Sequence, residues 1–232
     1  MKIKIINPNT SAGMTESISR IAAQYAAADT ELVVTSPRSG PLSIDCLYDE
    51  ALAQAGVLEE VKSGIEKGCD GFIIACFNDP ALFAAREICS EPVVGIGEAS
   101  LFTACYLGYR FSILSNMDNE EAAMWELVKR YGMETRCSSI RPSGIAVMEC
   151  EEDVKVMEKG LIRAGRVAVE KDRAEVLCLG CAGMAGMDRA LEQALSVPVI
   201  DPVAAALKAV EGLIVCGKKT SKILSFRTPS KL

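Results

Sequence analysis

Short apolar runs alternate with amphipathic stretches along the whole chain. The short runs are rich in Ile, Val, Leu and Phe and have the length of buried strands. They occupy residues 3–6, 31–35, 72–75, 92–96, 111–114, 137–140, 176–179 and 197–200. The stretches between them carry apolar residues three or four positions apart, which predicts helices. These helices span residues 15–28, 49–67, 120–131, 154–168, 187–195 and 203–215, and Pro80 suits the first turn of another.

Strands that alternate with helices form parallel sheets covered by helices, and here the pattern runs twice. Matching strand ends recur at nearly constant offsets: Pro92 and Pro198 are 106 positions apart, Cys76 and Cys181 are 105 apart, and Asn7 and Ser115 are 108 apart. We therefore predict an α/β fold of two half-domains related by a pseudo-twofold axis. Each is a parallel sheet flanked by helices, and the active site lies in the cleft between them.

The expected boundary between the halves lies near residues 99–110. The first half-domain covers residues 1–103 and the second covers 104–201. The last helix, at 202–216, is a candidate to pack back on the first half-domain. Residues 217–232 form a basic tail that is expected to be solvated or to act as a loose cap.

Cys76 and Cys181 each follow an apolar run and open a turn of small residues. Ligands of parallel α/β sheets bind beyond the carboxyl ends of the strands, so the two thiols should line one cleft. Backbone amides at an expected helix start after each cysteine would lower the thiol pKa toward neutrality. The same amides could hold an enolate oxygen. The chain has no histidine, so acid–base chemistry must use other groups such as these thiols.

The cysteines, and the aspartates near helix starts, also have structural interpretations. A lone cysteine after a buried strand is more often structural than catalytic, and only the pairing favours catalysis. Cys178 and Cys181 have the C-x-x-C spacing of redox and zinc motifs, but Cys178 lies inside a predicted strand and no second pair exists. Asp79 and Asp201 stand before or at helix starts, where capping is the expected role.

The first strand is followed by a polar turn, Asn7-Pro-Asn-Thr-Ser11. Thr10, Ser11 or Thr15 could cap the next helix, which would by itself explain the polar residues. The same turn also offers donors and acceptors for a small polar ligand. Both interpretations are compatible.

Composition narrows the function. Of 232 residues, 50% are hydrophobic and 24% are charged, and the net charge is −6 without a basic stripe on any predicted helix. These values are typical of a soluble globular protein and argue against nucleic acid as a partner. Ten cysteines lie mostly among apolar residues, and no signal peptide or membrane-spanning run is seen, which predicts a reducing cytoplasm and no membrane. No nucleotide-binding glycine motif occurs, so nucleotide binding has little support, whereas composition leaves a pyridoxal phosphate Schiff base open. No second C-x-x-C pair occurs, so we expect no metal. We expect a homo-oligomer that acts on a small-molecule substrate.

The turns resemble those of the hydantoin and allantoin racemases, within the aspartate/glutamate/hydantoin racemase superfamily. The motifs that carry the resemblance are Ile6-Asn-Pro-Asn-Thr-Ser11, Ala75-Cys-Phe-Asn-Asp-Pro80, Gly180-Cys-Ala-Gly-Met184 and Val197-Pro-Val-Ile-Asp201. Aspartate and glutamate racemases instead carry Cys-Asn-Thr and Gly-Cys-Thr-His at the two cysteines.

The resemblance implies a cofactor-independent racemase of 5-substituted hydantoins or of allantoin. One cysteine, as thiolate, takes the proton from C5 of the ring and the other returns a proton to the opposite face. Cys76 and Cys181 would be this pair, with their roles exchanged between enantiomers. The amides expected to hold the enolate belong to Phe77, Asn78, Ala182 and Gly183. The residues expected to bind the ring's amide edges are Asn9, Thr10, Ser115 and Asn116, while Phe77 or the loop 43–48 would line the pocket for the 5-substituent.

Other functions stay open at this point. Within the superfamily they are an amino-acid racemase, a maleate isomerase or an arylmalonate decarboxylase. The decarboxylases use a single cysteine, so two matching thiols count against that choice. A non-enzymatic small-molecule sensor on a two-lobed scaffold is a further alternative.

Overall fold

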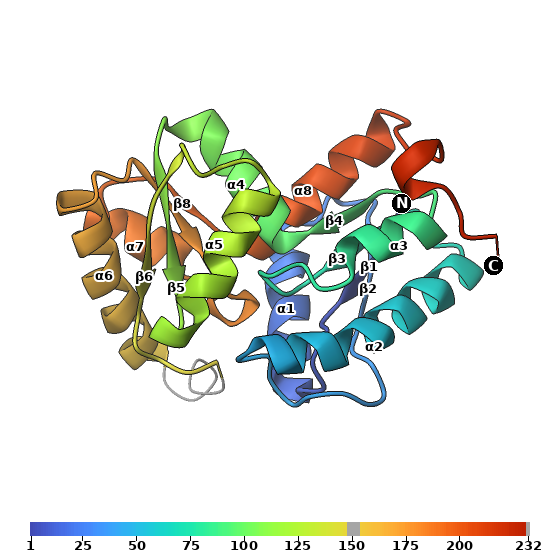
Figure 1. Ribbon diagram of the computed structural model, residues 1–232, viewed down its shortest axis with the longest axis horizontal. Helices are drawn as coiled ribbons and strands as arrows, with labels where there is room; N and C mark the ends of the chain where they lie inside the picture. Colours follow the sequence, from blue (N-terminus) through green and yellow to red (C-terminus); the bar gives the residue numbers. More distant parts are fainter. Residues whose placement is uncertain (148–153, 231–232) are drawn as a thin grey trace.

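Two parallel sheets form the framework of the protein, in a computed structural model that describes residues 1–147 and 154–230. The first sheet has the strand order β2-β1-β3-β4 and the second has the order β6-β5-β7-β8. The strands of the first sheet are β1 (Lys2–Ile6), β2 (Glu31–Thr35), β3 (Gly71–Ile74) and β4 (Val93–Gly95). Those of the second are β5 (Phe111–Ser115), β6 (Cys137–Pro142), β7 (Val176–Leu179) and β8 (Val199–Ile200). The sheets lie side by side in the two lobes of Figure 1.

The two sheets are wound in the same way, which confirms the predicted pair of related α/β halves. In each half the first strand is paired on both sides in parallel register, for example Ile5 with Val34 and Ile73. Ile113 of β5 is paired in the same way with Ile140 and Cys178. The strands are apolar throughout because helices cover both faces of each sheet.

The helices that cover the sheets are α1 (Ala12–Tyr25), α2 (Leu47–Glu66), α3 (Leu82–Ile88), α4 (Ile96–Leu107), α5 (Glu121–Arg130), α6 (Val154–Glu170), α7 (Asp188–Leu195) and α8 (Pro202–Val215). On one face of the first sheet, Ile5 packs in a cluster with Ile18 of α1 and Leu207 of α8. On its other face, Phe72 packs in a cluster with Val57 of α2. None of the helices in the described ranges combines the length and the apolar character that crossing a bilayer requires.

Helix α1 begins three residues earlier than its apolar spacing predicts. Ser11, one of the three candidate caps, has an extended backbone and its hydroxyl accepts a hydrogen bond from the amide of Met14 at 3.1 Å. Capping of this kind fixes where the helix starts. Pro80 also differs from expectation, because α3 starts only at Leu82, after Ala81 in a left-handed conformation with φ of 59°.

The segment expected to be a boundary between the halves is helix α4. Its residues Ile96, Ser100, Leu101 and Ala104 are all fully buried. Helix α4 packs against helix α8, its counterpart in the second half, and against β7 of the second sheet. Apolar residues therefore surround α4 on several sides. A helix buried in this way lacks the single apolar stripe by which amphipathic helices are found in a sequence.

The last helix returns to the first half of the molecule. Helix α8 packs against α1, β3 and β4 (Figure 1). The described part of the basic tail then lies against α3. The ring of Phe226 lies 6.0 Å from that of Phe83 in α3, and the amide of Thr220 donates to the carbonyl of Ser90, just after that helix, at 2.8 Å.

Because α4 is buried, its apolar side chains are expected to contribute strongly to the stability of the fold. Leu101→Ala is expected to lower the free energy of unfolding by about 2–5 kcal/mol, because it leaves a cavity in a fully buried site. Leu107→Ala, at the exposed end of the same helix, is the matched control and should have a much smaller effect. Urea unfolding followed by circular dichroism measures both. Equal losses in the two variants would contradict the central position of α4.

Candidate active site

A cavity of about 470 Å³ lies at the carboxyl ends of the strands, between the two halves. Cys76 and Cys181 both line it, the first from the turn after β3 and the second from the turn after β7. Both thiols are partly buried. The structure therefore brings the two cysteines of the repeated motif to one site.

Each sulfur is contacted by the backbone amide two residues further along the chain. The amide of Gly183 donates to Cys181 Sγ at 3.3 Å, within the short 3-10 turn η3 (Ala182–Met184). The Asn78 backbone hydrogen-bonds the Cys76 thiol and favours its ionised form. The two halves therefore match both in the positions of the thiols and in the backbone amides that donate to them. The amides that the sequence assigns to an enolate oxygen point, in these two cases, at sulfur.

The expected lowering of the thiol pKa is not found at Cys76. Burial raises the pKa of the Cys76 thiol to about 12, and the carboxylates of Glu50, Asp79 and Glu120 act in the same direction. The Asn78 amide opposes this only in part. The expectation fails because no helix starts at Cys76: α3 begins at Leu82, so the favourable end of its dipole is not at the sulfur.

The turn after β1 supplies Asn7 and Asn9 to the cavity wall. Asn7 Nδ2 donates to Asn9 Oδ1 at 2.7 Å and to Thr15 Oγ1 at 3.0 Å. Asn9 Oδ1 also accepts from the amide of Ser11 at 2.9 Å. The turn is therefore held rigidly by its own side chains and caps α1, while it presents amide groups to the cavity.

The second half supplies Asn116 and Glu120 from the segment after β5, which includes the 3-10 turn η1 (Asp118–Glu120). Asn116 Nδ2 donates to the carbonyl of Ile145 at 3.1 Å, and the amide of Asn116 donates to Glu120 Oε2 at 3.2 Å. Burial raises the pKa of Glu120 to about 7, and the nearby Asp45 adds to the effect. Around neutral pH this carboxyl can either donate or accept a hydrogen bond.

Asn78 offers an acceptor beside Cys76. Its Nδ2 donates to Glu50 Oε2 at 3.2 Å, and burial raises the pKa of Glu50. Its Oδ1 is buried and has no hydrogen-bond partner among the described residues. An unpaired buried oxygen is costly, so a ligand with an N–H group would relieve it.

Much of the remaining wall is apolar. Its residues come from the start of α2 and the loop before it, from α5, and from scattered positions: Met14, Ile44, Leu47, Tyr48, Phe77, Ala122, Ala123, Met124 and Val147. Leu47 and Tyr48 are 66% and 71% exposed, so they stand at the mouth of the cavity. The site thus joins a polar inner wall to an apolar mouth, as small-molecule sites usually do.

The residues predicted from the sequence separate into two groups. Those found in the cavity wall are Cys76, Cys181, Asn9, Phe77, Asn78, Asn116 and Ala182. Thr10, Ser115 and Gly183 are not among the described lining residues. Thr10 donates to the Pro41 carbonyl at 3.2 Å, and Ser115 is fully buried. Their contact with a ligand stays a prediction.

Sequence reasoning missed Asn119 and Glu120 as lining residues. They lie in the short turn η1, which no periodic pattern marks. Asn7 and Asp45 also line the cavity, the first from the polar turn after β1 and the second from the loop 43–48, both of which the sequence assigns to the cleft. Among the described residues, no cluster of three or more His, Cys, Asp and Glu side chains could hold a metal ion.

Comparison with known structures places this arrangement of sheets and cleft among racemases. Allantoin racemase from Klebsiella pneumoniae superposes with a TM-score of 0.97 at 38% identity, over 100% of this chain and 95% of the other. Allantoin racemase from Pseudomonas fluorescens superposes with a TM-score of 0.96 at 36% identity, over 99% and 97% of the two chains. Arylmalonate decarboxylase, at 17% identity and a TM-score of 0.65, shares the fold alone.

Comparison with known sequences also finds racemases. It is 46% identical over 231 residues to hydantoin racemase from Pseudomonas sp. strain NS671, covering 100% of this chain and 93% of the relative. It is 40% identical over 232 residues to hydantoin racemase from Paenarthrobacter aurescens, covering 100% and 98%. The model of the Asp/Glu/Hydantoin racemase family matches residues 3–210. The protein belongs to this family, and it is an isomerase of the racemase type.

The raised pKa of Glu120 has a measurable effect on stability. The folded protein keeps this proton up to about pH 7, whereas an unfolded glutamate loses it near about pH 4.3. Between these values the free energy of unfolding should therefore fall as the pH rises. Glu120→Gln should make this fall shallower, by up to the contribution of one proton, in urea unfolding curves recorded across the window.

Asp118→Asn, an exposed carboxylate of the same short turn, is the control for this experiment. It removes one carboxylate from the same turn without changing a buried site, so a change of slope in Glu120→Gln alone belongs to Glu120. A Glu120→Gln variant with the slope of the wild type would show that Glu120 is ionised throughout the range.

Proposed function

We propose that the protein is a cofactor-independent racemase of 5-substituted hydantoins or of allantoin, and that Cys76 and Cys181 form its two-base pair. The observation that carries the proposal is the meeting of two thiols, from equivalent turns of the two halves, in one cavity. The names of the relatives, hydantoin racemase and allantoin racemase, support the substrate class.

The proposed reaction begins with one cysteine as thiolate and the other as thiol. The thiolate takes the C5 proton, and the electrons of the C–H bond move into the neighbouring carbonyl to form an enolate. The opposite thiol then delivers its proton to the other face of C5, and the electrons return to carbon. The two cysteines have then exchanged protonation states, so the reverse reaction starts from the other enantiomer.

The surroundings of Cys76 suit this chemistry. Burial disfavours the thiolate, so the sulfur is a stronger base once it is ionised than an exposed thiolate would be. A strong base is useful because a carbon flanked by a carbonyl and a nitrogen is a weak acid. The amides of Asn78 and Gly183 each favour the ionised form of the sulfur to which they donate.

The asparagine-rich wall suits the ring. A hydantoin ring offers N–H donors and carbonyl acceptors along its edge, and amide side chains can pair with both. Asn78 Oδ1 is the acceptor that we assign to a ring N–H, since no described residue occupies it. The amide groups of Asn9 and Asn116 would complete the polar contacts, and the enolate oxygen would be stabilised there. The apolar mouth at Leu47 and Tyr48 would receive the 5-substituent.

Two further expectations go with this proposal. We place the enzyme in the cytoplasm, because the proposed chemistry needs reduced thiols and a reducing compartment preserves them. We also expect association of the chain into a homo-oligomer.

The thiol pair is tested by replacing each member. Cys76→Ala and Cys181→Ala should each slow racemisation by at least about 10²–10⁴-fold, since each removes one positioned acid–base group. The measurement follows the optical rotation of enantiopure 5-substituted hydantoins and of allantoin. Cys216→Ala, which changes an exposed thiol far along the chain, is the control. Racemisation by both variants at the wild-type rate would rule out the mechanism.

A finer experiment separates the two half-reactions. Each single variant keeps one thiol, so it should still exchange the C5 proton for solvent deuterium, but only in the enantiomer whose proton faces that thiol. Proton NMR in deuterated buffer gives the two exchange rates. Exchange of both enantiomers by one variant would contradict the assignment of one thiol to each face.

A further inference from the structure

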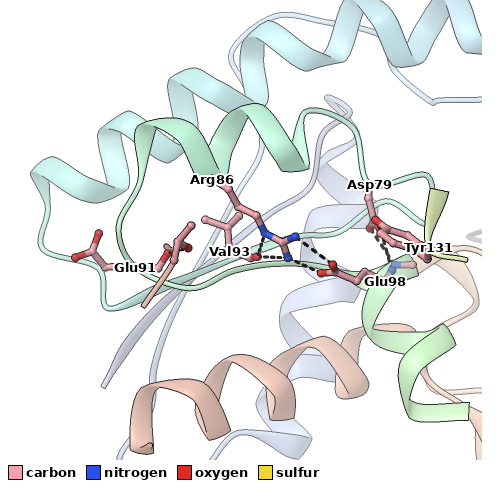
Figure 2. A network of polar contacts seen from close by, with 8 residues as sticks. Asp79, Arg86, Glu91, Val93, Glu98 and Tyr131 are labelled. Atoms are coloured by element: carbon pink, nitrogen blue, oxygen red, sulfur yellow. Dashed lines mark hydrogen bonds and ion pairs between the residues drawn. The ribbon is translucent and has the colours of Figure 1, made fainter. Parts of the chain in front are cut away.

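Behind the wall of the cavity lies a buried carboxylate with three hydrogen-bond donors. Asp79 follows Cys76 by three residues, is 1% exposed and does not line the cavity itself. It accepts from the amide of Gly97 at 3.0 Å, from the amide of Glu98 at 2.7 Å and from Tyr131 Oη at 2.6 Å. Figure 2 shows Asp79 and Tyr131 together at the start of α4.

These donors belong to elements outside the turn that carries Cys76. Gly97 and Glu98 lie in the first turn of α4, where a carboxylate stabilises free amides and the helix dipole. Tyr131 ends α5 in the second half of the molecule. The Asp79 side chain therefore fastens the Cys76 turn to the helix between the halves and to the second half itself.

The backbone around Asp79 adopts a conformation that allows these hydrogen bonds. Asp79 has a φ of 53°, a left-handed conformation that a non-glycine residue adopts at a cost. Its amide donates to the carbonyl of Cys76 at 3.0 Å, which closes the turn. A side chain at Gly95 would overlap the Asp79 carboxylate, and one at Gly97 would overlap the carbonyl of Phe77. Two glycines thus leave room for the carboxylate and for the turn.

The start of α4 is in turn fixed from its other side. Arg86 of α3 pairs with the Glu98 carboxylate, with Nη2 2.5 Å from Oε2, and donates to the carbonyl of Val93 (Figure 2). Glu98 consequently holds Arg86 by its side chain and Asp79 by its amide. The amides that receive Asp79 have little freedom to move.

In the second half, another buried aspartate makes comparable hydrogen bonds. Asp201 caps α8, accepting from the amide of Ala204 at 2.9 Å, and its other oxygen accepts from the amide of Gly186 at 2.6 Å. Gly186 lies in the loop that follows Cys181. In both halves, one buried carboxylate joins the loop after the cysteine to the start of the helix that packs across to the other half.

We propose that Asp79 is a positioning residue for Cys76. It fixes the sulfur against the C5 face of the substrate by holding the turn to α4 and to Tyr131, without touching the substrate. Asp201 does the same for Cys181. This inference rests on the proposed racemase activity, and it assigns a separate support to each of the two thiols.

The test measures each thiol in the absence of the other. Asp79→Asn is introduced into Cys181→Ala, where exchange depends on Cys76, and into Cys76→Ala, where it depends on Cys181. The asparagine keeps the size of the side chain but places an amide N–H against one of the backbone donors. Deuterium exchange at C5 should slow by about 10- to 100-fold in the first background, as expected for a misplaced base, and stay unchanged in the second.

Two further variants complete the design. Tyr131→Phe removes one donor and keeps the carboxylate, so it should produce the same selectivity with a smaller loss if Asp79→Asn folds poorly. Asp201→Asn should reverse the pattern and slow only the Cys181-dependent exchange. Equal slowing in both backgrounds would show a general structural role, and no slowing in either would show no role, so both outcomes overturn the proposal.

A substrate-free measurement separates this inference from the proposed function. If the wild type racemises neither hydantoins nor allantoin, the proposed function fails, and alkylation by iodoacetamide followed by mass spectrometry still reports on the turn. Asp79→Asn should then speed alkylation of Cys76, because it loosens the turn that holds the thiol, and leave Cys181 unchanged. An unaltered ratio of the two alkylation rates would refute the positioning role.

Discussion

The packing of α4 against α8 is the contact on which the active site depends. Each helix follows the last strand of one half and packs against a strand of the other, α4 against β7 and α8 against β3. Fully buried residues such as Leu101 and Leu207 fill the space around these contacts. Burial of this kind leaves the two halves few relative positions. Two thiols from different sheets are thereby held at one cavity.

The repeat extends from the fold to the surroundings of the two cysteines. Each cysteine has an amide donor two residues later, and each loop is fastened by a buried aspartate. A racemase has to treat two mirror-image substrates alike, so a scaffold with two matching halves is suited to the task. The match is not complete: the turn after Cys181 is a short 3-10 helix, whereas the one after Cys76 contains two left-handed residues. The two sulfurs therefore reach similar positions by different backbone paths.

The sequence alone predicts the strands, the repeat and the cysteine pair, because each leaves a local signal. Buried parallel strands are continuous apolar runs, and Cys76 and Cys181 both stand where such a run ends. Helix α4 leaves no such signal, because Leu101 and Ser100 are buried on different sides of it. Asp79 was expected to cap the helix that follows it, but its carboxylate reaches the start of α4. Glu120 reaches the site through tertiary packing, which no spacing reveals. Contacts between segments that are distant in the chain leave no local pattern, so they cannot be predicted from a single sequence.

The return of α8 to the first half affects how the chain is made. Val203, Leu207 and Val210 of this helix fill one face of the first sheet, together with Ile3, which lies almost at the other end of the chain. During synthesis the first half emerges long before this helix does. The part of this face that α1 does not cover would therefore stay exposed until α8 has left the ribosome. The two halves look like separate folding units in the repeat, but the first can be completed only together with the second.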